Sequence, residues 1–166
     1  MHRLLPALFI LSGCAENEPL ALVDTVDLDA YTGTWYEIAR LPNAFEKNCE
    51  GVTATYAIRD DGLIDVLNKC YKDSPDGTLK EANGRARIVD EVSNAHLQVS
   101  FFGPFWGDYQ ILDVDEESYS LVGNDSRKYL WILAREPELD DETLDRLLDQ
   151  AWEQGFDVDA LHWTQH

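Results

Sequence analysis

The sequence predicts an all-β protein: an eight-stranded antiparallel up-and-down barrel with one α-helix outside it and a short final strand. Three observations predict this fold. Eight strand-like segments follow one another without a helix between them, so parallel pairing is not indicated. Most of the connections are short and rich in turn residues. One amphipathic helical segment stands near the C-terminal end, after the last of the eight strands.

The eight segments combine β-branched and aromatic residues with alternating polarity, and turn signals separate them. In chain order they are TWYEIARL (34–41), VTATYAI (52–58), LIDVLNKCY (63–71), LKEANGRARIV (79–89), HLQVSFF (96–102), DYQILDV (108–114), YSLVG (119–123) and YLWILAR (129–135). Successive short connections favour a meander, and closing a meander into a barrel removes its exposed edges. The segment ALHWTQ (160–165) predicts the short final strand.

Alternation within the fourth segment separates small residues from larger polar ones. Ala82, Gly84 and Ala86 share one face, with Arg85 and Arg87 on the other. An eight-stranded barrel is just wide enough either to be filled by side chains or to hold one small ligand. Small inward residues favour a ligand cavity, but the alternation alone leaves both readings open.

The helical segment spans residues 140–155. Its apolar residues Leu144, Leu147, Leu148, Ala151 and Trp152 recur at helical spacing and form one stripe. Asp140 or Asp141 can cap its start, and Gly155 stands at its end. We expect the stripe to pack on the outside of the barrel, in preference to a membrane or a partner.

Composition bounds the size and excludes some partners. The chain has 166 residues, enough for one domain with a sizeable core, and carries 32 acidic against 13 basic side chains for a formal charge of −19. So acidic a surface repels nucleic acid and anionic lipid head groups. We therefore expect no nucleic-acid partner.

The first residues have the pattern of an export signal. MHRLLPALFIL has a basic start and about ten apolar residues, fewer than the roughly 20 needed to span a bilayer. LSGC then resembles a bacterial lipobox, whose cysteine is acylated and becomes the new N-terminus. This predicts a lipoprotein signal peptide at 1–13, a lipidated Cys14, a tether at 14–26 and one domain at 27–166. The alternative is a plain signal peptide with an incidental cysteine.

Cys49 and Cys70 flank two predicted strands joined by a turn at RDDG. Folding this hairpin brings the two cysteines roughly opposite each other, and an exported chain lies in an oxidising compartment where disulfides persist. We expect a disulfide; two buried free thiols are the alternative. No CxxC and no histidine at metal-ligand spacing accompany them, so we expect no metal site and no redox site.

Two further motifs resemble those of the lipocalins. GTWYEIARLP matches their first motif, Gly-x-Trp, and YLWILARE matches the last barrel motif, which ends in arginine. With VTATY and SFFGPFWGDY, the chain is similar to the bacterial outer-membrane lipoproteins of the apolipoprotein D-like branch. The resemblance implies that Gly33, Trp35 and Arg135 are structural motif residues, with the Trp across the closed end of the barrel and the Arg packed over it.

The resemblance also implies a calyx, open at one end, that carries a fatty acid or a lysophospholipid at the outer membrane, on its periplasmic face. The inward residues expected to line the ligand site are Tyr56, Val66, Asn68, Ala82, Val99, Phe101, Tyr109, Val122, Tyr129 and Trp131. Phe45, Phe105 and Trp106 are expected in loops around the mouth, where they would cover the ligand, touch a membrane, touch a second subunit of a homodimer, or simply pack. Glu37 is expected to point inward and to pair with Arg135.

Two other functions are weighed against lipid carriage. A lipid-modifying enzyme finds no support, because the chain has no Gly-x-Ser-x-Gly elbow and none of its four histidines has a nucleophile at recognisable spacing. We expect no enzymatic activity and no cofactor. A structural envelope lipoprotein with a filled barrel is the third hypothesis, and a cavity below about 100 Å³ would favour it.

Overall fold

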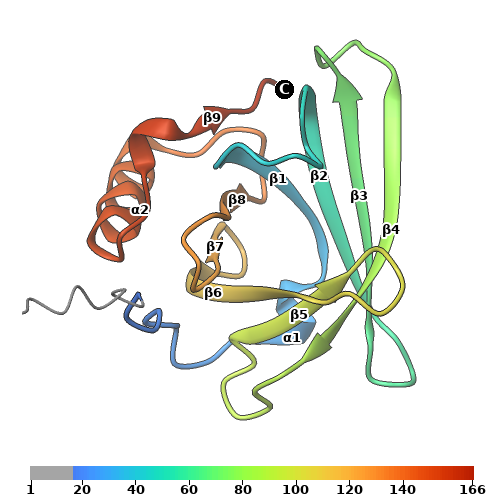
Figure 1. Ribbon diagram of the computed structural model, residues 1–166, viewed down its shortest axis with the longest axis vertical. Helices are drawn as coiled ribbons and strands as arrows, with labels where there is room; N and C mark the ends of the chain where they lie inside the picture. Colours follow the sequence, from blue (N-terminus) through green and yellow to red (C-terminus); the bar gives the residue numbers. More distant parts are fainter. Residues whose placement is uncertain (1–16) are drawn as a thin grey trace, which may run out of the picture.

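The computed structural model describes residues 17–166, so the predicted signal peptide and Cys14 lie outside the described residues. The chain order is one short helix, eight strands, a longer helix, a 3-10 turn and a final strand (Figure 1). The strands are β1 (Gly33–Arg40), β2 (Cys49–Ile58), β3 (Ile64–Lys72), β4 (Leu79–Ile88), β5 (His96–Ser100), β6 (Gly107–Asp115), β7 (Tyr119–Gly123), β8 (Leu130–Ala134) and β9 (His162–Trp163). The helices are α1 (Leu28–Tyr31) and α2 (Asp141–Glu153), and the 3-10 turn is η1 (Val158–Ala160).

The sheet closes on itself. Strands β1 to β8 pair antiparallel in sequence order, and β1 also pairs with β8. β9 adds to β1 outside this ring. The prediction of an eight-stranded antiparallel barrel with a short final strand is therefore confirmed.

The two ends of the barrel differ. Helix α1 lies at one end, where the short turns of β2–β3, β4–β5 and β6–β7 also gather; we call it the closed end (Figure 1). The connections 41–48, 73–78, 101–106 and 124–129 surround the opposite end, the mouth. The half of the interior next to each end is called the closed half or the mouth half.

Apolar residues form two main cores. One fills the barrel interior around Trp35, Tyr56 and Leu97. The other lies between the outer wall and α2, where Leu147 and Ala151 are fully buried. Helix α2 thus packs outside the barrel as predicted, and the Asp140 side chain caps it by accepting from the Thr143 amide.

The predicted helix stripe was wrong at one position. Trp152 is 68% exposed, whereas Leu144 and Leu148 pack against the outer core with the two buried residues. At 100° per residue, Trp152 lies about 90° from the centre of the stripe formed by the other four, so its ring points past the wall.

Residues 17–26, expected to belong to a tether, lie along the barrel. Leu20 and Val26 are buried, the Leu20 amide donates to Asp125, and the Val23 amide donates to the Ile111 carbonyl at 3.1 Å. The packed part of the chain therefore begins before residue 27. None of the helices in this described part has the length and apolar composition needed to cross a bilayer.

The last residues complete the wall near the mouth. β1 pairs with β2 only from Gly33 to Tyr36, and beyond that point β9 takes the edge of β1 that β2 has left. The Thr164 amide donates to the Ile38 carbonyl at 3.1 Å, and the Gly51 amide donates to the Gln165 carbonyl at 2.6 Å. The segment after β9 therefore bridges β1 and β2 where they separate.

Candidate ligand-binding site

Tyrosine hydroxyl groups fill the closed half of the interior. Tyr109 Oη lies 2.8 Å from Tyr31 Oη and 3.0 Å from Tyr56 Oη, and Tyr31 Oη lies 2.9 Å from Ser120 Oγ. Burial raises the pKa of Tyr31 to about 12 and that of Tyr109 well above its ordinary value, so both are neutral hydroxyl groups. The cavity beside these rings measures about 20 Å³, room for a water molecule and too small for an alkyl chain.

Four of the predicted ligand residues lie in this packed half. They are Tyr56, Val66, Tyr109 and Val122, and all four are buried. They contact the interior core, so in this structure they support the floor of a site and are not its open wall. Helix α1 also places Tyr31 among them, a residue that the alternation of the strands does not predict; Asp27 as N-cap of α1 was the available signal.

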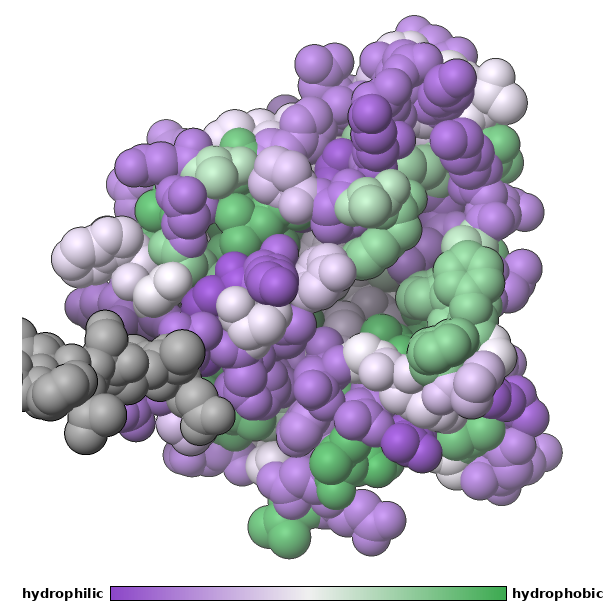
Figure 2. Space-filling view, viewed as in Figure 1, coloured by the Kyte–Doolittle hydropathy of each residue, from purple (hydrophilic) through white to green (hydrophobic). Residues whose placement is uncertain are grey.

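The mouth half is more open. The β2–β3–β4 register puts Ala54, Asn68 and Ala82 side by side on the inner face, one row nearer the mouth than Tyr56 and Val66. Ala82 is exposed and Ala54 is half-buried, although both face inward. The remaining predicted residues, Val99, Phe101, Tyr129 and Trp131, are also partly exposed. Figure 2 shows a recess on this side of the molecule that hydrophobic side chains border.

Gly84 has a different role from the one expected. A Cβ atom built at this position would lie 2.7 Å from the Phe101 ring, so the ring packs directly on the β4 backbone. Gly84 therefore makes room for Phe101 and not for a ligand. The interpretation of the small β4 face as a cavity wall holds only nearer the mouth, at Ala82.

Aromatic rings line one side of the mouth. Phe45 stacks on Tyr129 with ring centroids 5.6 Å apart, and Tyr129 stacks on Trp131 at 5.9 Å. The Trp131 indole donates to the Glu46 carboxylate at 3.1 Å, so the stack is tied to the connection 41–48, the first mouth loop. Phe45 remains 64% exposed. This stack joins the mouth loop to the barrel interior.

The other two loop aromatics do not cover the mouth in the same way. Trp106 packs under the guanidinium of Arg87, 4.2 Å from the ring centroid, with Arg85 at 5.3 Å. These arginines are on the outer face of β4, so Trp106 belongs to the outer wall. Phe105 is 77% exposed.

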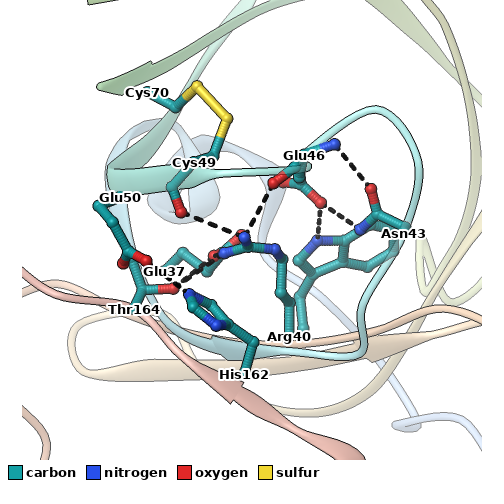
Figure 3. The surroundings of a disulfide bond; sticks show 10 residues. Glu37, Arg40, Asn43, Glu46, Cys49, Glu50, Cys70, His162 and Thr164 are labelled. Carbon is teal, nitrogen blue, oxygen red and sulfur yellow. Dashed lines mark hydrogen bonds and ion pairs between the residues drawn. A yellow bond between two sulfur atoms is a disulfide. The ribbon is translucent and has the colours of Figure 1, made fainter. Parts of the chain in front are cut away.

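A buried contact between Glu37 and Arg40 anchors the first mouth loop (Figure 3). Glu37 pairs with Arg40, whose Nη1 also donates to Thr164 and whose Nη2 donates to the carbonyls of Glu46 and Cys49. Burial, reinforced by Glu46, raises the pKa of Glu37 to about 8 although Arg40 opposes that shift. The cluster ties β1, the loop and the segment after β9 together.

The expected partner of Glu37 was wrong. Arg135 lies at the closed end, with its guanidinium carbon 3.7 Å from the Trp35 ring centroid. A bulge in the β1–β8 ladder between Glu37 and Ala39 brings Arg40 onto the side of Glu37. Neither Arg40 nor Glu46 was singled out in the sequence, where a bulge leaves no signal.

The family motif residues have the positions that the resemblance implies. The Trp35 indole donates to the Tyr31 carbonyl, and Arg135 covers the ring while donating to the carbonyls of Thr34, Ala30 and Glu116. Gly33 has a φ of +92°, a conformation that favours glycine. These contacts seal the closed end.

The predicted disulfide is present between Cys49 and Cys70, with Cα atoms 5.3 Å apart. It joins the start of β2, directly after the first mouth loop, to β3 (Figure 3). Cys70 lies on the same face of β3 as Asn68, two residues nearer the mouth. The bridge therefore fixes the wall beside the open half.

A second hollow, of about 330 Å³, lies beneath the first mouth loop. Its lining combines Arg40, Lys47 and His162 with Glu46, Glu50 and Asp73. Such mixed charge suits a solvated hollow better than an alkyl chain. Between residues 17 and 166, no group of three or more His, Cys, Asp or Glu side chains is placed to hold a metal ion.

Comparison with known proteins agrees with this architecture. Residues 26–166 match a family model described as a lipocalin-like domain. The chain is 42% identical to the outer membrane lipoprotein Blc of Escherichia coli, over 98% of this chain and 97% of that protein. It is 36% identical to apolipoprotein D of Mus musculus, over 85% of this chain and 77% of that one. Insecticyanin of the tobacco hornworm Manduca sexta superposes with a TM-score of 0.72, at 21% identity over 92% and 86% of the two chains.

These matches confirm two expectations from the sequence. The resemblance to bacterial outer-membrane lipoproteins of the apolipoprotein D-like branch is confirmed by relatives of both kinds. The expected localisation, a lipid-anchored protein of the bacterial outer membrane, is confirmed by the relatives from Escherichia coli and from Vibrio cholerae, the latter 40% identical. Lipidation at Cys14 stays a prediction, because that residue is outside the described residues.

Proposed function

The chain belongs to the lipocalin-like family, and on that premise we propose that it binds and carries a hydrophobic ligand in the mouth half of its barrel. The observation that carries the proposal is the partial exposure of inward-facing apolar side chains there. Ala54, Ala82, Phe101 and Trp131 face the interior yet keep accessible surface, whereas the closed half is packed.

Burial of an alkyl chain in the mouth half would be favourable. Burying one CH₂ group is worth about 0.8 kcal/mol. The charged groups beside this wall are already engaged, because Glu37 bonds with Arg40 and the Glu46 carboxylate accepts from the Trp131 indole. A fatty acid or a lysophospholipid would place its chain against Phe101, Val99 and Trp131. Tyr129 and Asn68 stand nearer the mouth, where a polar head group would lie.

The proposed carrier works at the outer membrane, held by acyl chains on Cys14 and facing the periplasm. Residues 17–26 lie along the barrel, so the anchor would keep the calyx close to the lipid surface. The exposed Phe45 and Phe105 at the mouth would touch the membrane or a second subunit of a homodimer during transfer. In this proposal the protein binds and releases its ligand unchanged and catalyses no reaction.

One observation favours a second candidate function. The 20 Å³ cavity of the closed half is far below the roughly 300–1,000 Å³ of drug-sized ligand sites. A lipoprotein with a purely structural role in the cell envelope needs no ligand cavity, so an interior packed this closely is compatible with that role. The two functions differ in whether the mouth half binds an apolar molecule.

Titration of delipidated protein with the apolar fluorophore N-phenyl-1-naphthylamine tests the proposal. We expect saturable binding that palmitate or a lysophospholipid reverses. Ala82→Trp should weaken the binding at least tenfold because its ring would fill the mouth half. Ala57→Trp is the matched control, since Ala57 is exposed on the outer face of β2.

Two results would contradict carriage in the mouth half. Absence of saturable binding to folded protein would favour the structural role. Equal binding by Ala82→Trp and the native protein would place the fluorophore elsewhere. A normal circular dichroism spectrum and melting transition for each variant establish that it is folded.

A further inference from the structure

We infer that the protein docks on an anionic lipid bilayer with the mouth of the barrel against the membrane and the closed end facing away. The docking surface, called the mouth face, consists of the connections 41–48, 101–106 and 124–129. The inference rests on the proposed lipid anchor at Cys14 and adds the surface that meets the membrane. It follows from the path of the N-terminal segment, from exposed phenylalanines at the mouth and from the charges of the two ends.

The first described residues are bound to one of the mouth connections. The Asn17 side chain donates to the Asp125 carbonyl at 3.3 Å, and the Leu20 amide donates to the Asp125 carboxylate at 3.1 Å. Cys14 precedes Asn17 by three residues, which reach at most about 11 Å even when fully extended. The five residues of β7 put the closed end about 17 Å from this connection. Acyl chains on Cys14 would therefore enter a membrane beside the mouth.

Exposed phenylalanines stand on two other sides of the mouth. Phe45 in the connection 41–48 is 64% exposed, and Phe102 and Phe105 in the connection 101–106 are each 77% exposed. Hydrophobic side chains border the recess in Figure 2 on more than one side. Apolar surface of this kind is unfavourable in water and would be buried in the outer part of a bilayer.

The three connections of the mouth face lie at different points around the barrel. They join β1 to β2, β5 to β6 and β7 to β8, and these strands follow one another around the closed sheet. Three separate contacts define a plane. A flat lipid surface can therefore meet both phenylalanine-bearing connections and the site of the anchor at once.

The two ends of the barrel differ in charge. The closed-end turns hold one basic residue, Arg59, which pairs with neighbouring aspartates. The four mouth connections hold four acidic residues against three basic ones, and Lys72 and Lys80 flank one of these connections. An anionic bilayer therefore repels the closed end more strongly than the mouth. The acidic residues of the closed-end turns are Asp60, Asp61, Asp90, Glu91, Glu116 and Glu117.

A bilayer fits the mouth face better than a second copy of the chain does. Two copies packed mouth to mouth would place both anchor sites in the plane between the barrels, where the short reach from Asn17 leads to no membrane. With the mouth against the bilayer, the anchor and the phenylalanines act at the same surface. A ligand would then pass between the membrane and the barrel without crossing the periplasm.

Nitroxide labels at both ends of the full-length, acylated protein test this orientation. The protein is placed in vesicles of phosphatidylethanolamine with phosphatidylglycerol as the anionic lipid. Ala44→Cys and Phe105→Cys put labels on the mouth face, and Val92→Cys is the matched control in the β4–β5 turn, where Val92 is 91% exposed. Cys49 and Cys70 are bonded to each other, so the label reacts with the introduced cysteine.

Electron paramagnetic resonance measures how often each label collides with a water-soluble nickel complex. Each value is taken relative to the same label on the Cys14→Ser chain in solution. We expect vesicles to lower the nickel collision rate about tenfold at positions 44 and 105, because a polar complex is excluded from hydrocarbon. At position 92 the rate should stay the same.

The phenylalanines are tested by Phe102→Ser combined with Phe105→Ser, read by the label at position 44. Nickel access there should rise towards its value in solution, because the mouth face loses apolar surface that holds it in the bilayer. Val92→Ser should leave the access unchanged. All of these positions are exposed, and saturable binding of the fluorophore shows that each variant is folded.

Three results would overturn the inference: nickel access at the mouth equal to that at position 92, protection at position 92 in place of the mouth, or protection at position 44 that survives the double serine variant. Dipolar broadening between labels at position 105 that unlabelled protein removes would also overturn it, in favour of a second copy.

The outcome is separable from that of the carrier proposal. A mature protein whose mass shows no acyl chains on Cys14 would remove the anchor and this inference, and would leave fluorophore binding in the barrel untouched. Protected mouth labels on a protein that binds no fluorophore would keep the orientation and remove carriage.

Discussion

At the scale of single residues, Trp35 and Arg135 show how the closed end is held. The guanidinium lies over the indole and also donates to three backbone carbonyls from α1, β1 and the β6–β7 turn. A lysine could keep the charge but not this planar set of donors. The motif arginine therefore acts as a hydrogen-bonded lid on the Trp35 ring.

We predict that Arg135→Ala lowers the free energy of unfolding by about 2–3 kcal/mol, from the lost cation–π contact and the unpaired carbonyls. Arg135→Lys should recover less than half of that loss. Urea denaturation followed by tryptophan fluorescence measures both. Arg59→Ala is the control, because its exposed pairs with Asp61 and Asp65 are worth little. Equal effects of Arg135→Ala and Arg59→Ala would contradict the prediction.

Glu37 gives the protein a pH dependence of known sign. Its pKa is about 8 in the folded protein, against an ordinary value of 4.5. Between these two values the folded state holds a proton that the unfolded chain releases. The contribution of protonated Glu37 to the free energy of unfolding is therefore fully present below pH 4.5 and is lost as the pH rises through 8.

We predict that the free energy of unfolding falls by about 4 kcal/mol more in the native protein than in Glu37→Gln between pH 5 and pH 8.5. Glutamine keeps the neutral shape and cannot titrate. Urea denaturation at a series of pH values gives the two curves. Parallel curves would show that Arg40 keeps Glu37 ionised throughout.

The residues of the candidate site could be predicted only in part. Alternation correctly put Asn68 and Ala82 side by side on one face and Phe101 and Trp131 against the interior core, because side-chain direction in a strand has a period of two. It could not show that Phe101 needs Gly84, nor that Glu37 meets Arg40 across a bulge. Both depend on contacts between segments far apart or on an irregular backbone.

At the scale of elements, α2 shows what amphipathic spacing can and cannot determine. The spacing predicted a helix at 140–155 that packs outside the barrel, and α2 does so at Asp141–Glu153. It also included Trp152 in the buried stripe. A large apolar side chain at the edge of a stripe is buried only if the opposing wall extends that far, which depends on the fold and not on the helix sequence.

We predict that Leu147→Ala destabilises the protein by about 2–5 kcal/mol, since Leu147 is fully buried between α2 and the barrel and its truncation leaves a cavity. Trp152→Ala should change the free energy of unfolding by less than about 0.5 kcal/mol despite removing more atoms. Thermal and urea unfolding compare the two. A larger loss for Trp152→Ala would mean that its ring has a packing partner in solution.

At the scale of the whole molecule, the order of the strands was the easiest property to predict. Short turns between alternating segments leave the meander as the simplest topology, and the strand bounds differ from prediction by a few residues. The filling of the interior was not predictable in the same way. It depends on α1, which places Tyr31 between Tyr109 and Trp35. Four residues are too few to show the helical repeat of apolar side chains, so α1 could not be recognised in the sequence.

The overall charge of the chain should make its stability depend on salt. A formal charge of −19 should destabilise the compact state by self-repulsion, which salt screens. The Debye length falls from about 30 Å at 0.01 M salt to about 10 Å at 0.1 M, so most of the gain should come below 0.1 M. We expect sodium chloride at 0.1 M to raise the melting temperature by about 2–4 °C over 0.01 M at pH 7.5, or about 1 kcal/mol. The rise should shrink at pH 4.5, where many carboxylates are protonated; a rise of the same size at both pH values would assign it to a general salt effect.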